Sequence, residues 1–209
     1  MATCYKPADV AKSCDSADLK ALSGGLLIDL AAFVPTKHDT LKFTLSNIGV
    51  IDPDTGLYPV VGSDYYPVKV EWEKNAVKPN YEVISSEFKK DTYAQIASGI
   101  IINGSESNAG KETAMALTTR KWVFVYKATG VAYADDAYHV LGYKNGLQYV
   151  VEPTSDDLGG RVNGSLRSLT GAGEANPNGM NFILADGLAA TDTLFNNRFD
   201  TVVIPYSYD

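Results

Sequence analysis

The chain has 209 residues, of which 45% are hydrophobic, and a net charge of −7 from 18 basic and 25 acidic residues. These values are typical of an ordinary globular protein that is large enough for one sizeable core. The acidic excess argues against a surface that binds nucleic acid tightly by neutralising phosphates, and leaves only weak contact with DNA open.

Residues 1–23 are predicted to be an N-terminal extension of a single β-rich domain that spans residues 1–209. They contain both cysteines, Cys4 and Cys14, which form either a local disulfide or, in the plainer interpretation, two reduced thiols. The extension lacks the basic and apolar regions of a secretory signal, which predicts use without Sec export. The apolar stretch 24–34 that follows is too short to cross a bilayer, so we expect a buried strand and no membrane contact.

Alternating apolar and polar residues predict strands at 41–46, 67–74 and 81–88, because successive side chains of a strand point to opposite faces. The pattern is clearest in PVKVEWEK, residues 67–74. Its predicted core face consists of Val68, Val70 and Trp72. Its predicted water-facing side consists of Lys69, Glu71 and Glu73.

Residues 52–67, DPDTGLYPVVGSDYYP, interrupt the alternation and are predicted to form a long loop or arm that its prolines stiffen. The spacing of Asp52, Asp54 and Gly56 resembles the start of a calcium loop. The later ligands of such a loop, including a bidentate glutamate, are missing, so a β-turn is the favoured interpretation.

A helix is predicted over residues 108–119, with Asn108 as its cap and good helix formers through Leu117. It leads directly into KWVFVYK, residues 121–127, in which both alternating faces are apolar. Such a pattern predicts a central strand that is covered on both sides.

The stretch HVLGYKNGLQYVVE, residues 139–152, is predicted to be a β-hairpin that turns at Asn145 and Gly146, since a type I′ turn requires positive φ at both central residues. Short strands are predicted further on, within GSLRSL, MNFIL and RFDTVVIPY. Together these elements predict a mainly β, antiparallel sandwich or barrel with one α-helix packed against it.

Motifs for catalysis are absent: the sequence has no nucleophile elbow, no phosphate-binding loop and no HExxH zinc motif. Of the two histidines, His139 is interpreted as a structural residue and His38 as a solvated loop residue. The acidic pairs at 135–136 and 156–157 lie in predicted turns, where their side chains usually point into water; a carboxylate-based hydrolase is the less favoured alternative. We therefore predict no enzyme activity, no cofactor and no metal site.

Tyrosine is abundant, with 13 residues, and most are expected to populate the sheets. Tyr65, Tyr66, Tyr206 and Tyr208 lie near turns or the C-terminus and are predicted to belong to an interface or a carbohydrate-stacking surface, because tyrosine combines apolar area with a polar tip. No basic stripe accompanies them, which disfavours binding of single-stranded nucleic acid.

The order of elements from about residue 65 to 185 resembles that of bacteriophage tail tube proteins, which share their fold with the tubes of contractile injection systems. The resemblance is one of pattern: a β-rich half, a helix, the strand KWVFVYK, then GYKNGL and NGSLRSLTG. It implies a virion protein, assembled in the bacterial host cytoplasm, whose hexameric rings stack into a hollow tube.

The resemblance also implies partners and surfaces. The partners would be further copies of the chain and other tail or connector proteins, with viral DNA passing the acidic lumen without specific binding. The residues that would form the tube wall or its joints are Lys69, Glu71, Glu73, Tyr65, Tyr66, Tyr143, Asn145, Gly146 and Leu147. Alternatives are another ring-forming virion protein, such as a connector, terminator or decoration protein, and a carbohydrate-binding β-sandwich module.

Overall fold

The structure is a computed structural model of the full chain. It describes residues 24–35, 42–43, 48–71, 78–86, 89–103, 115–127, 137–151, 161–168, 180–182 and 188–200. The predicted N-terminal extension, Cys4, Cys14, His38 and both acidic pairs lie outside these ranges.

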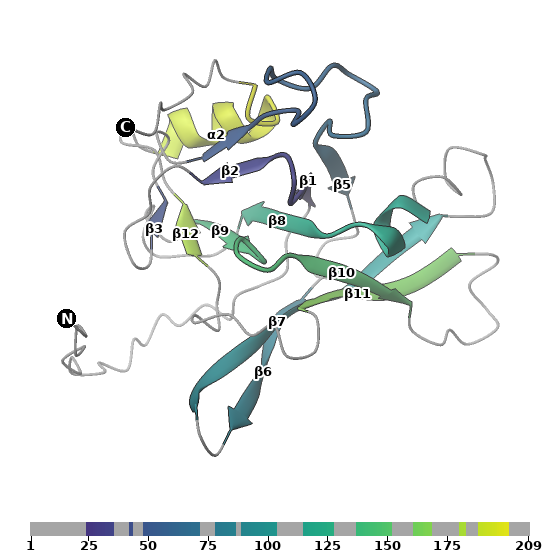
Figure 1. The fold of residues 1–209 in the computed structure, drawn as a ribbon, viewed down its shortest axis with the longest axis vertical. Coiled ribbons are helices and arrows are strands. Elements are labelled where there is room, and N and C mark those ends of the chain that lie inside the picture. Colours follow the sequence, from purple (N-terminus) through teal and green to yellow (C-terminus); the bar gives the residue numbers. More distant parts are fainter. Residues whose placement is uncertain are drawn as a thin grey trace.

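The described part is mainly β, with the helix α2 packed on one side of the sheet (Figure 1), which confirms the predicted fold class. The pairings are antiparallel apart from β12 with β3. The strands are β1 (Gly24–Asp29), β2 (Phe33–Pro35), β3 (Lys42–Phe43), β4 (Ile48–Val50), β5 (Val68–Glu71), β6 (Lys78–Ser86), β7 (Lys89–Asn103), β8 (Trp122–Lys127), β9 (Tyr138–Leu141), β10 (Leu147–Val151), β11 (Arg161–Ser168) and β12 (Met180–Phe182).

Strand β8 is the centre of the main sheet. On one edge it pairs with β1, which in turn pairs with β5. On its other edge β9 pairs with the C-terminal half of β8, while Leu147 of β10 lies opposite Trp122 at its start. The sheet therefore divides at β8 into two branches, β9-β12-β3 and β10-β11-β7-β6.

Each face of β8 contributes to a different hydrophobic core. Val123 and Val125 pack with β1, β9 and α2 on one side. Trp122, Phe124 and Tyr126 pack with β10, β11 and the helical turn at 115–119 on the other. All five side chains are buried, which confirms the prediction of a strand covered on both sides.

The predicted hairpin at 139–152 is wrong. Strands β9 and β10 both run antiparallel to β8, so they point in the same direction, and the residues between them connect two successive segments along one edge of β8. The connection is a tight turn in which the Gly146 N–H donates to the Gly142 carbonyl at 2.8 Å. Positive φ occurs at Gly142 (71°) and Gly146 (74°), whereas a type I′ turn would require it at Asn145.

Helix α2 (Leu188–Asn196) was not predicted from the sequence, in which this region reads as a connection between strands. Its buried residues Thr191 and Leu194 face the core that also contains Val123. Of the helix predicted at 108–119, residues 115–119 are helical and the rest lie outside the described ranges. The predicted strand at 198–206 begins in a turn instead, because Arg198 and Phe199 have positive φ.

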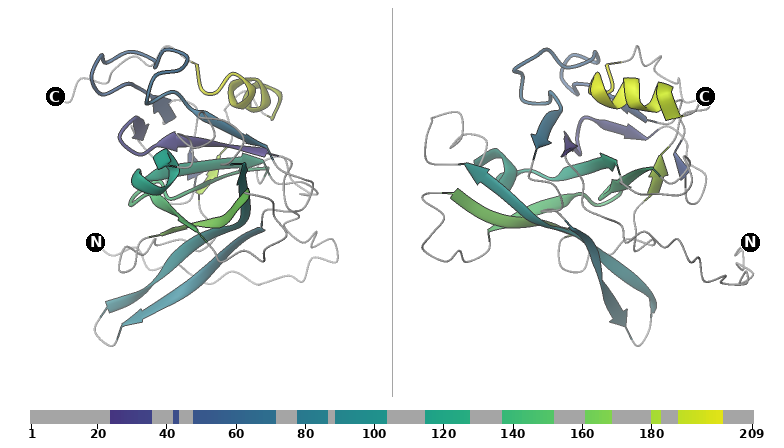
Figure 2. Two further views of the ribbon diagram at one scale, coloured as in Figure 1. Left: turned by 90° about the vertical axis from the view of Figure 1, so that its right-hand side faces the viewer. Right: turned by 180° about the vertical axis from the view of Figure 1, so that it is seen from behind.

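Strands β6 and β7 form a long antiparallel ribbon that projects from the body on the side away from α2 (Figures 1 and 2). Near its base β7 pairs with both β6 and β11, up to the pairing of Ile96 with Arg167. Beyond that point β7 pairs with β6 as far as Ser86 opposite Lys89. We call these two strands the β6–β7 ribbon.

Candidate assembly surface

The loop 51–67 begins with a compact turn at Asp52. The Asp52 side chain accepts a hydrogen bond from the Asp54 N–H at 2.9 Å, and its carbonyl accepts one from the Gly56 N–H at 2.8 Å. The Asp52 N–H donates to the Leu57 carbonyl, also at 2.8 Å, which closes the turn. The bend is thus a wider turn, closed by a hydrogen bond between residues four apart, than the predicted β-turn, with Gly56 at φ 70°.

Beyond this turn the loop presents large apolar side chains to water. Leu57, Val60 and Val61 are 69%, 76% and 77% exposed. Single exposed apolar residues are common on protein surfaces, but three within five residues of one loop form a local apolar tip. We call Leu57, Val60 and Val61 the loop tip.

Arg198 holds the loop against the end of α2. Its guanidinium donates to the Pro67 carbonyl at 3.1 Å and lies 5.0 Å from the centre of the Tyr66 ring. The Tyr58 hydroxyl in turn donates to the Arg198 carbonyl at 2.9 Å. Burial, reinforced by Tyr66 and Asp200, raises the pKa of Tyr58 to about 12, so its hydroxyl remains a donor even above the ordinary tyrosine pKa of about 10.

Arg120 holds the same end of the loop, three residues before Pro67. It donates to the Asp64 carbonyl at 2.7 Å and pairs with the Asp64 carboxylate at 2.9 Å. The same guanidinium reaches the buried carboxylate of Asp29 at 3.5 Å and lies 5.8 Å from the centre of the Tyr65 ring. The loop tip is therefore presented by a segment that is held at Tyr58 and from Asp64 to Pro67, so little conformational entropy is lost when a partner binds it.

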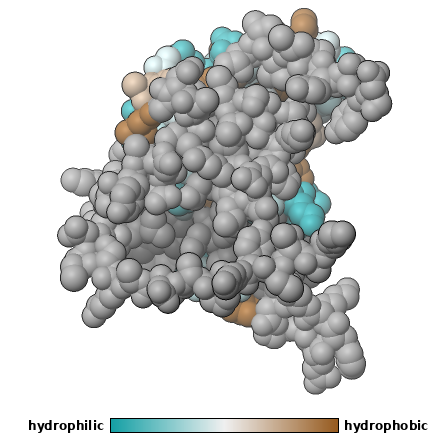
Figure 3. All heavy atoms as spheres, turned by 90° about the vertical axis from the view of Figure 1, so that its left-hand side faces the viewer, coloured by the Kyte–Doolittle hydropathy of each residue, from teal (hydrophilic) through white to brown (hydrophobic). Residues whose placement is uncertain are grey.

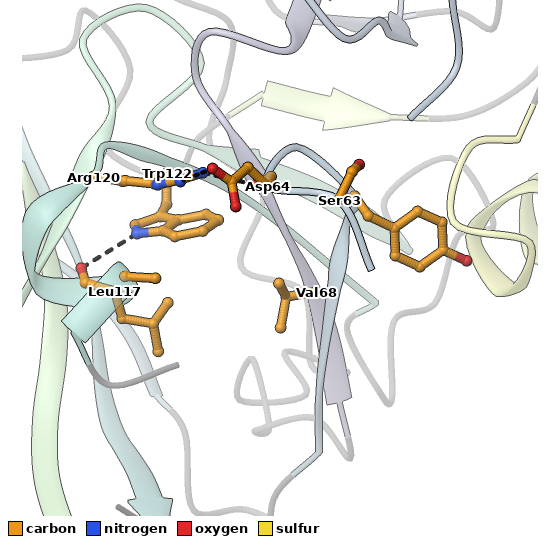
Figure 4. Close-up of a pocket in the computed structure, with 8 residues that line it drawn as sticks. Ser63, Asp64, Val68, Leu117, Arg120 and Trp122 are labelled. Atoms are coloured by element: carbon orange, nitrogen blue, oxygen red, sulfur yellow. Dashed lines mark hydrogen bonds and ion pairs between the residues drawn. The ribbon is translucent and has the colours of Figure 1, made fainter. Parts of the chain in front are cut away.

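A pocket of about 240 Å³ lies next to this anchor (Figure 4). Trp122 lines it and is fixed by a hydrogen bond from its indole N–H to the Leu117 carbonyl at 3.2 Å. In Figure 4 the Trp122 ring, Leu117 and Val68 face a common space, and the charged ends of Arg120 and Asp64 lie at its edge. The complete lining is Ser63, Asp64, Tyr66, Val68, Ala116, Leu117, Arg120 and Trp122.

The projecting β6–β7 ribbon carries a second exposed apolar surface. Tyr81 and Val83 are 43% and 54% exposed, and Val83 pairs with Tyr93 across the ribbon. Tyr81 packs edge-on against Tyr93 with their ring centres 5.7 Å apart. By strand alternation these side chains share a face with Gln95, which is fully buried at the base of the ribbon. We call Tyr81, Val83 and Tyr93 the ribbon face.

The ribbon face therefore lies on the same side of the sheet as residues that are buried where the ribbon joins the body. Gln95 accepts a hydrogen bond from the Gly142 N–H at 2.7 Å, and its own N–H donates to the Ser168 hydroxyl at 3.0 Å. Ala97 follows on the same side and packs in the core with Trp122. Figure 3 shows another side of the molecule, on which the coloured residues include both hydrophobic and hydrophilic ones.

The tyrosines predicted for an interface are partly covered within the chain. Tyr65 packs against the core around Val123 and Tyr66 lies between Tyr58 and Arg198. Tyr206 and Tyr208 lie outside the described residues. Tyr143 also packs partly against the core, while Asn145 is half-buried beside it.

Gly146 and Leu147 are buried, and Leu147 belongs to the core around Trp122. On β5, Lys69 is exposed while Val68 and Val70 pack against that same core, as the alternation predicts. Glu71 is the last residue of β5, and Glu73 lies outside the described residues. The loop tip and the ribbon face were not predicted, although the run Leu57 to Val61 in a turn-rich segment offered a signal for the first.

Lys127, Tyr138 and Asp192 form a close polar group between β8, β9 and α2. Asp192 Oδ1 accepts hydrogen bonds from the Lys127 ammonium and the Tyr138 hydroxyl. Burial raises the pKa of Tyr138, and the hydrogen bond to Asp192 and its charge add to this effect. The pocket lining contains none of the three, so we interpret the group as an anchor of α2.

His139 is buried and stacks on Tyr126 with ring centres 5.2 Å apart, consistent with a structural role. Across the described ranges, no three His, Cys, Asp or Glu side chains are grouped closely enough to hold a metal ion. No helix within those ranges is long and apolar enough to span a membrane.

Comparisons with known proteins give no match: no family model, no curated protein and no solved structure is similar to this chain.

Proposed function

We propose that the protein is a structural virion protein whose copies assemble into stacked rings that form a phage tail tube for the passage of DNA. It acts without catalysis, and its partners are copies of itself and neighbouring tail proteins. The observation that carries the proposal is the presence of two separate apolar surfaces, the loop tip and the ribbon face, on different parts of one chain.

The placement of these surfaces favours repeated assembly over binding of a single partner. The loop 51–67 and the β6–β7 ribbon extend from the body in different directions (Figures 1 and 2). A subunit with distinct contact surfaces on different sides can form head-to-tail contacts, which close into rings or continue as filaments. The pattern resemblance to tail tube proteins and the net charge of −7, which would let DNA pass without adhering, support the same proposal.

Negative-stain electron microscopy and light scattering of the purified protein test this proposal. Rings or tubes of constant width are expected. A protein that remains monomeric at millimolar concentration would refute assembly as its function.

The contribution of the loop tip is tested by replacing Leu57, Val60 and Val61 together with serine. All three side chains are exposed, so the variant should fold normally and assemble poorly. Deleting the whole segment 52–64 is a less informative test, because it also removes Tyr58, which packs against the core. A matched control replaces the exposed Val150 and Val151 of β10 with serine; equal loss of assembly in the control would remove the special role of the loop tip.

A further inference from the structure

We infer that Tyr81 of one copy inserts into the pocket beside Trp122 of the next copy, so that the β6–β7 ribbon and this pocket form the head-to-tail contact. The inference rests on the proposed function, because it names the residues that join successive subunits. Its occupant is a second copy of this chain.

The first argument is the fit between the pocket and a tyrosine side chain. The pocket measures about 240 Å³, the volume of about eight waters at ~30 Å³ each, which is space enough for a tyrosine side chain. Its apolar wall consists of Val68, Ala116, Leu117 and Trp122, and its edge carries Arg120 and Asp64. Such a pocket matches a ring with an apolar body and a polar tip.

The second argument is that the Tyr81 side chain is exposed and already held in one orientation. Its ring is 43% exposed and held edge-on against Tyr93, so it is already oriented before it meets a partner. Preorganised aromatic side chains are the residues that most often dominate the free energy of binding at protein interfaces.

The third argument is charge. The loop 51–67 that borders the pocket has no basic residue and three acidic ones, giving a net charge of −3. Strands β6 and β7 together have three lysines and two acids, giving a net charge of +1. Copies that each carry −7 repel one another overall, so a contact between oppositely charged regions is the favoured way for two of them to approach. The residues counted are Asp52, Asp54 and Asp64 in the loop and Lys78, Lys89, Lys90, Glu82 and Asp91 in the strands.

The fourth argument is placement. The ribbon leaves the body on the side away from the loop 51–67, and the pocket is bordered by that loop and β5 (Figures 1 and 4). The ribbon of a copy that occupies a neighbour's pocket therefore leaves its own pocket available for a third copy. This arrangement propagates, as a ring or filament requires.

The experiment uses two variants of the full chain. Tyr81→Ala removes the inserting ring but keeps the pocket, whereas Ala116→Phe fills the pocket but keeps the ring. Each variant alone is expected to need about 30-fold more protein to assemble, the effect of losing one dominant aromatic contact. Mixed in equal amounts they are expected to form a heterodimer and nothing larger, because only one productive contact remains, and analytical ultracentrifugation measures this.

Two variants serve as matched controls. Glu82→Asp shortens the exposed neighbour of Tyr81 on the opposite face of β6 without changing the charge of the ribbon, and Met115→Phe adds the same ring to the helical turn outside the pocket lining. Both should assemble like the unmodified protein. Thermal unfolding establishes that each variant is folded; if Ala116→Phe does not fold, Val68→Met reduces the same space more gently.

A second measurement uses the tryptophans. The chain has two, so Trp72→Phe leaves Trp122 in the pocket wall as the sole reporter. Trp122 is already buried, so contact with the incoming ring should change the intensity of its emission, and Tyr81→Ala should abolish the change.

The outcomes separate the two proposals. If the unmodified protein assembles and both variants assemble equally well, the Tyr81 contact is wrong while the proposed function stands. If the unmodified protein stays monomeric, both are wrong.

Discussion

The Lys127 ammonium lies 2.5 Å from Oδ1 of Asp192, so an ion pair joins strand β8 to helix α2 across 65 residues of chain. The Tyr138 hydroxyl donates to the same carboxylate oxygen. One acidic side chain therefore connects α2 to both β8 and β9, and α2 in turn continues into Arg198, which anchors the loop 51–67.

Replacing Asp192 with asparagine should lower the free energy of unfolding by about 1 kcal/mol, because it weakens a partly exposed ion pair and a hydrogen bond from a buried tyrosine. Urea denaturation measures the change. Asp54→Asn, at an exposed position with the same loss of charge, is the control and should be nearly neutral. Equal effects in the two variants would show that net charge alone, and not the anchor, is responsible.

The same group predicts a dependence of stability on pH. Burial alone would raise the pKa of Asp192, but hydrogen bonds from Lys127 and Tyr138 and the charge of Lys127 outweigh burial and hold it below its usual value. Because the carboxylate is favoured in the folded state, its contribution is present above about pH 4 and is lost as the pH falls through the lowered pKa. Asp192→Asn should therefore lose less stability than the unmodified protein on acidification from pH 5 to pH 2.

At high pH the dependence of stability on pH has the opposite sign. The raised pKa of Tyr138 means that ionisation is disfavoured in the folded protein, so stability falls as the pH rises above the ordinary tyrosine pKa of about 10. Tyr138→Phe should flatten this limb in melting curves taken between pH 9 and pH 11, and an unchanged slope would contradict the assignment.

Gly142 and Gly56 allow backbone strain to be separated from steric overlap. Their φ values are 71° and 70°, but a Cβ on Gly142 would lie 3.0 Å from the Trp122 carbonyl and 2.6 Å from Leu147 Cγ, whereas Gly56 has no atom within 4 Å. Gly56→Ala should cost about 1 kcal/mol, the cost of a left-handed backbone conformation alone. Gly142→Ala should cost about 3 kcal/mol. Similar losses would mean that the turn between β9 and β10 adjusts easily.

Ser63→Ala tests an unusual hydroxyl in the pocket wall. Ser63 Oγ is buried and has no hydrogen-bond partner. Removing it should therefore leave the free energy of unfolding unchanged or raise it by up to about 1 kcal/mol, with a melting temperature that is equal or higher. Ser165→Ala is the matched control, because the buried Ser165 hydroxyl accepts a hydrogen bond from Arg167 at 2.7 Å; this variant should be less stable. A clear loss of stability in Ser63→Ala would reveal a partner for the hydroxyl.

Local sequence patterns correctly predicted the strands in which each face has the same surroundings, either core or water, from end to end. The doubly apolar strand β8 and the alternation of Val68, Lys69 and Val70 appear in the structure as expected. The 15-residue strand β7 was missed, although its run of isoleucines before Asn103 is typical of a strand. Helix α2 was missed because LAATDTLFN is short and its amphipathic pattern is weak.

Strand pairing was the part that the sequence predicted incorrectly. Turn residues such as Gly142 and Gly146 indicate where the chain bends, but the direction of the next strand depends on its partners. Here β10 is fixed by β11 and by Trp122 of β8, and β9 by β8 and β12. The anchoring of the loop 51–67 could not be predicted from the sequence either, because Arg198 contacts Pro67 across 131 residues of chain.

The position of β1 between β5 and β8 has a consequence during protein synthesis. Gly25 pairs with Tyr126 and Asp29 with Trp122, so β1 must wait for about a hundred further residues to be made, on the order of 5–20 s at typical elongation rates. Throughout that interval its apolar side chains, Leu26 to Ile28, have no β8 to pack against. A ribosome-bound chain that stops before residue 122 is therefore expected to depend on chaperones, and the proposed assembly can begin only after the central strand has emerged.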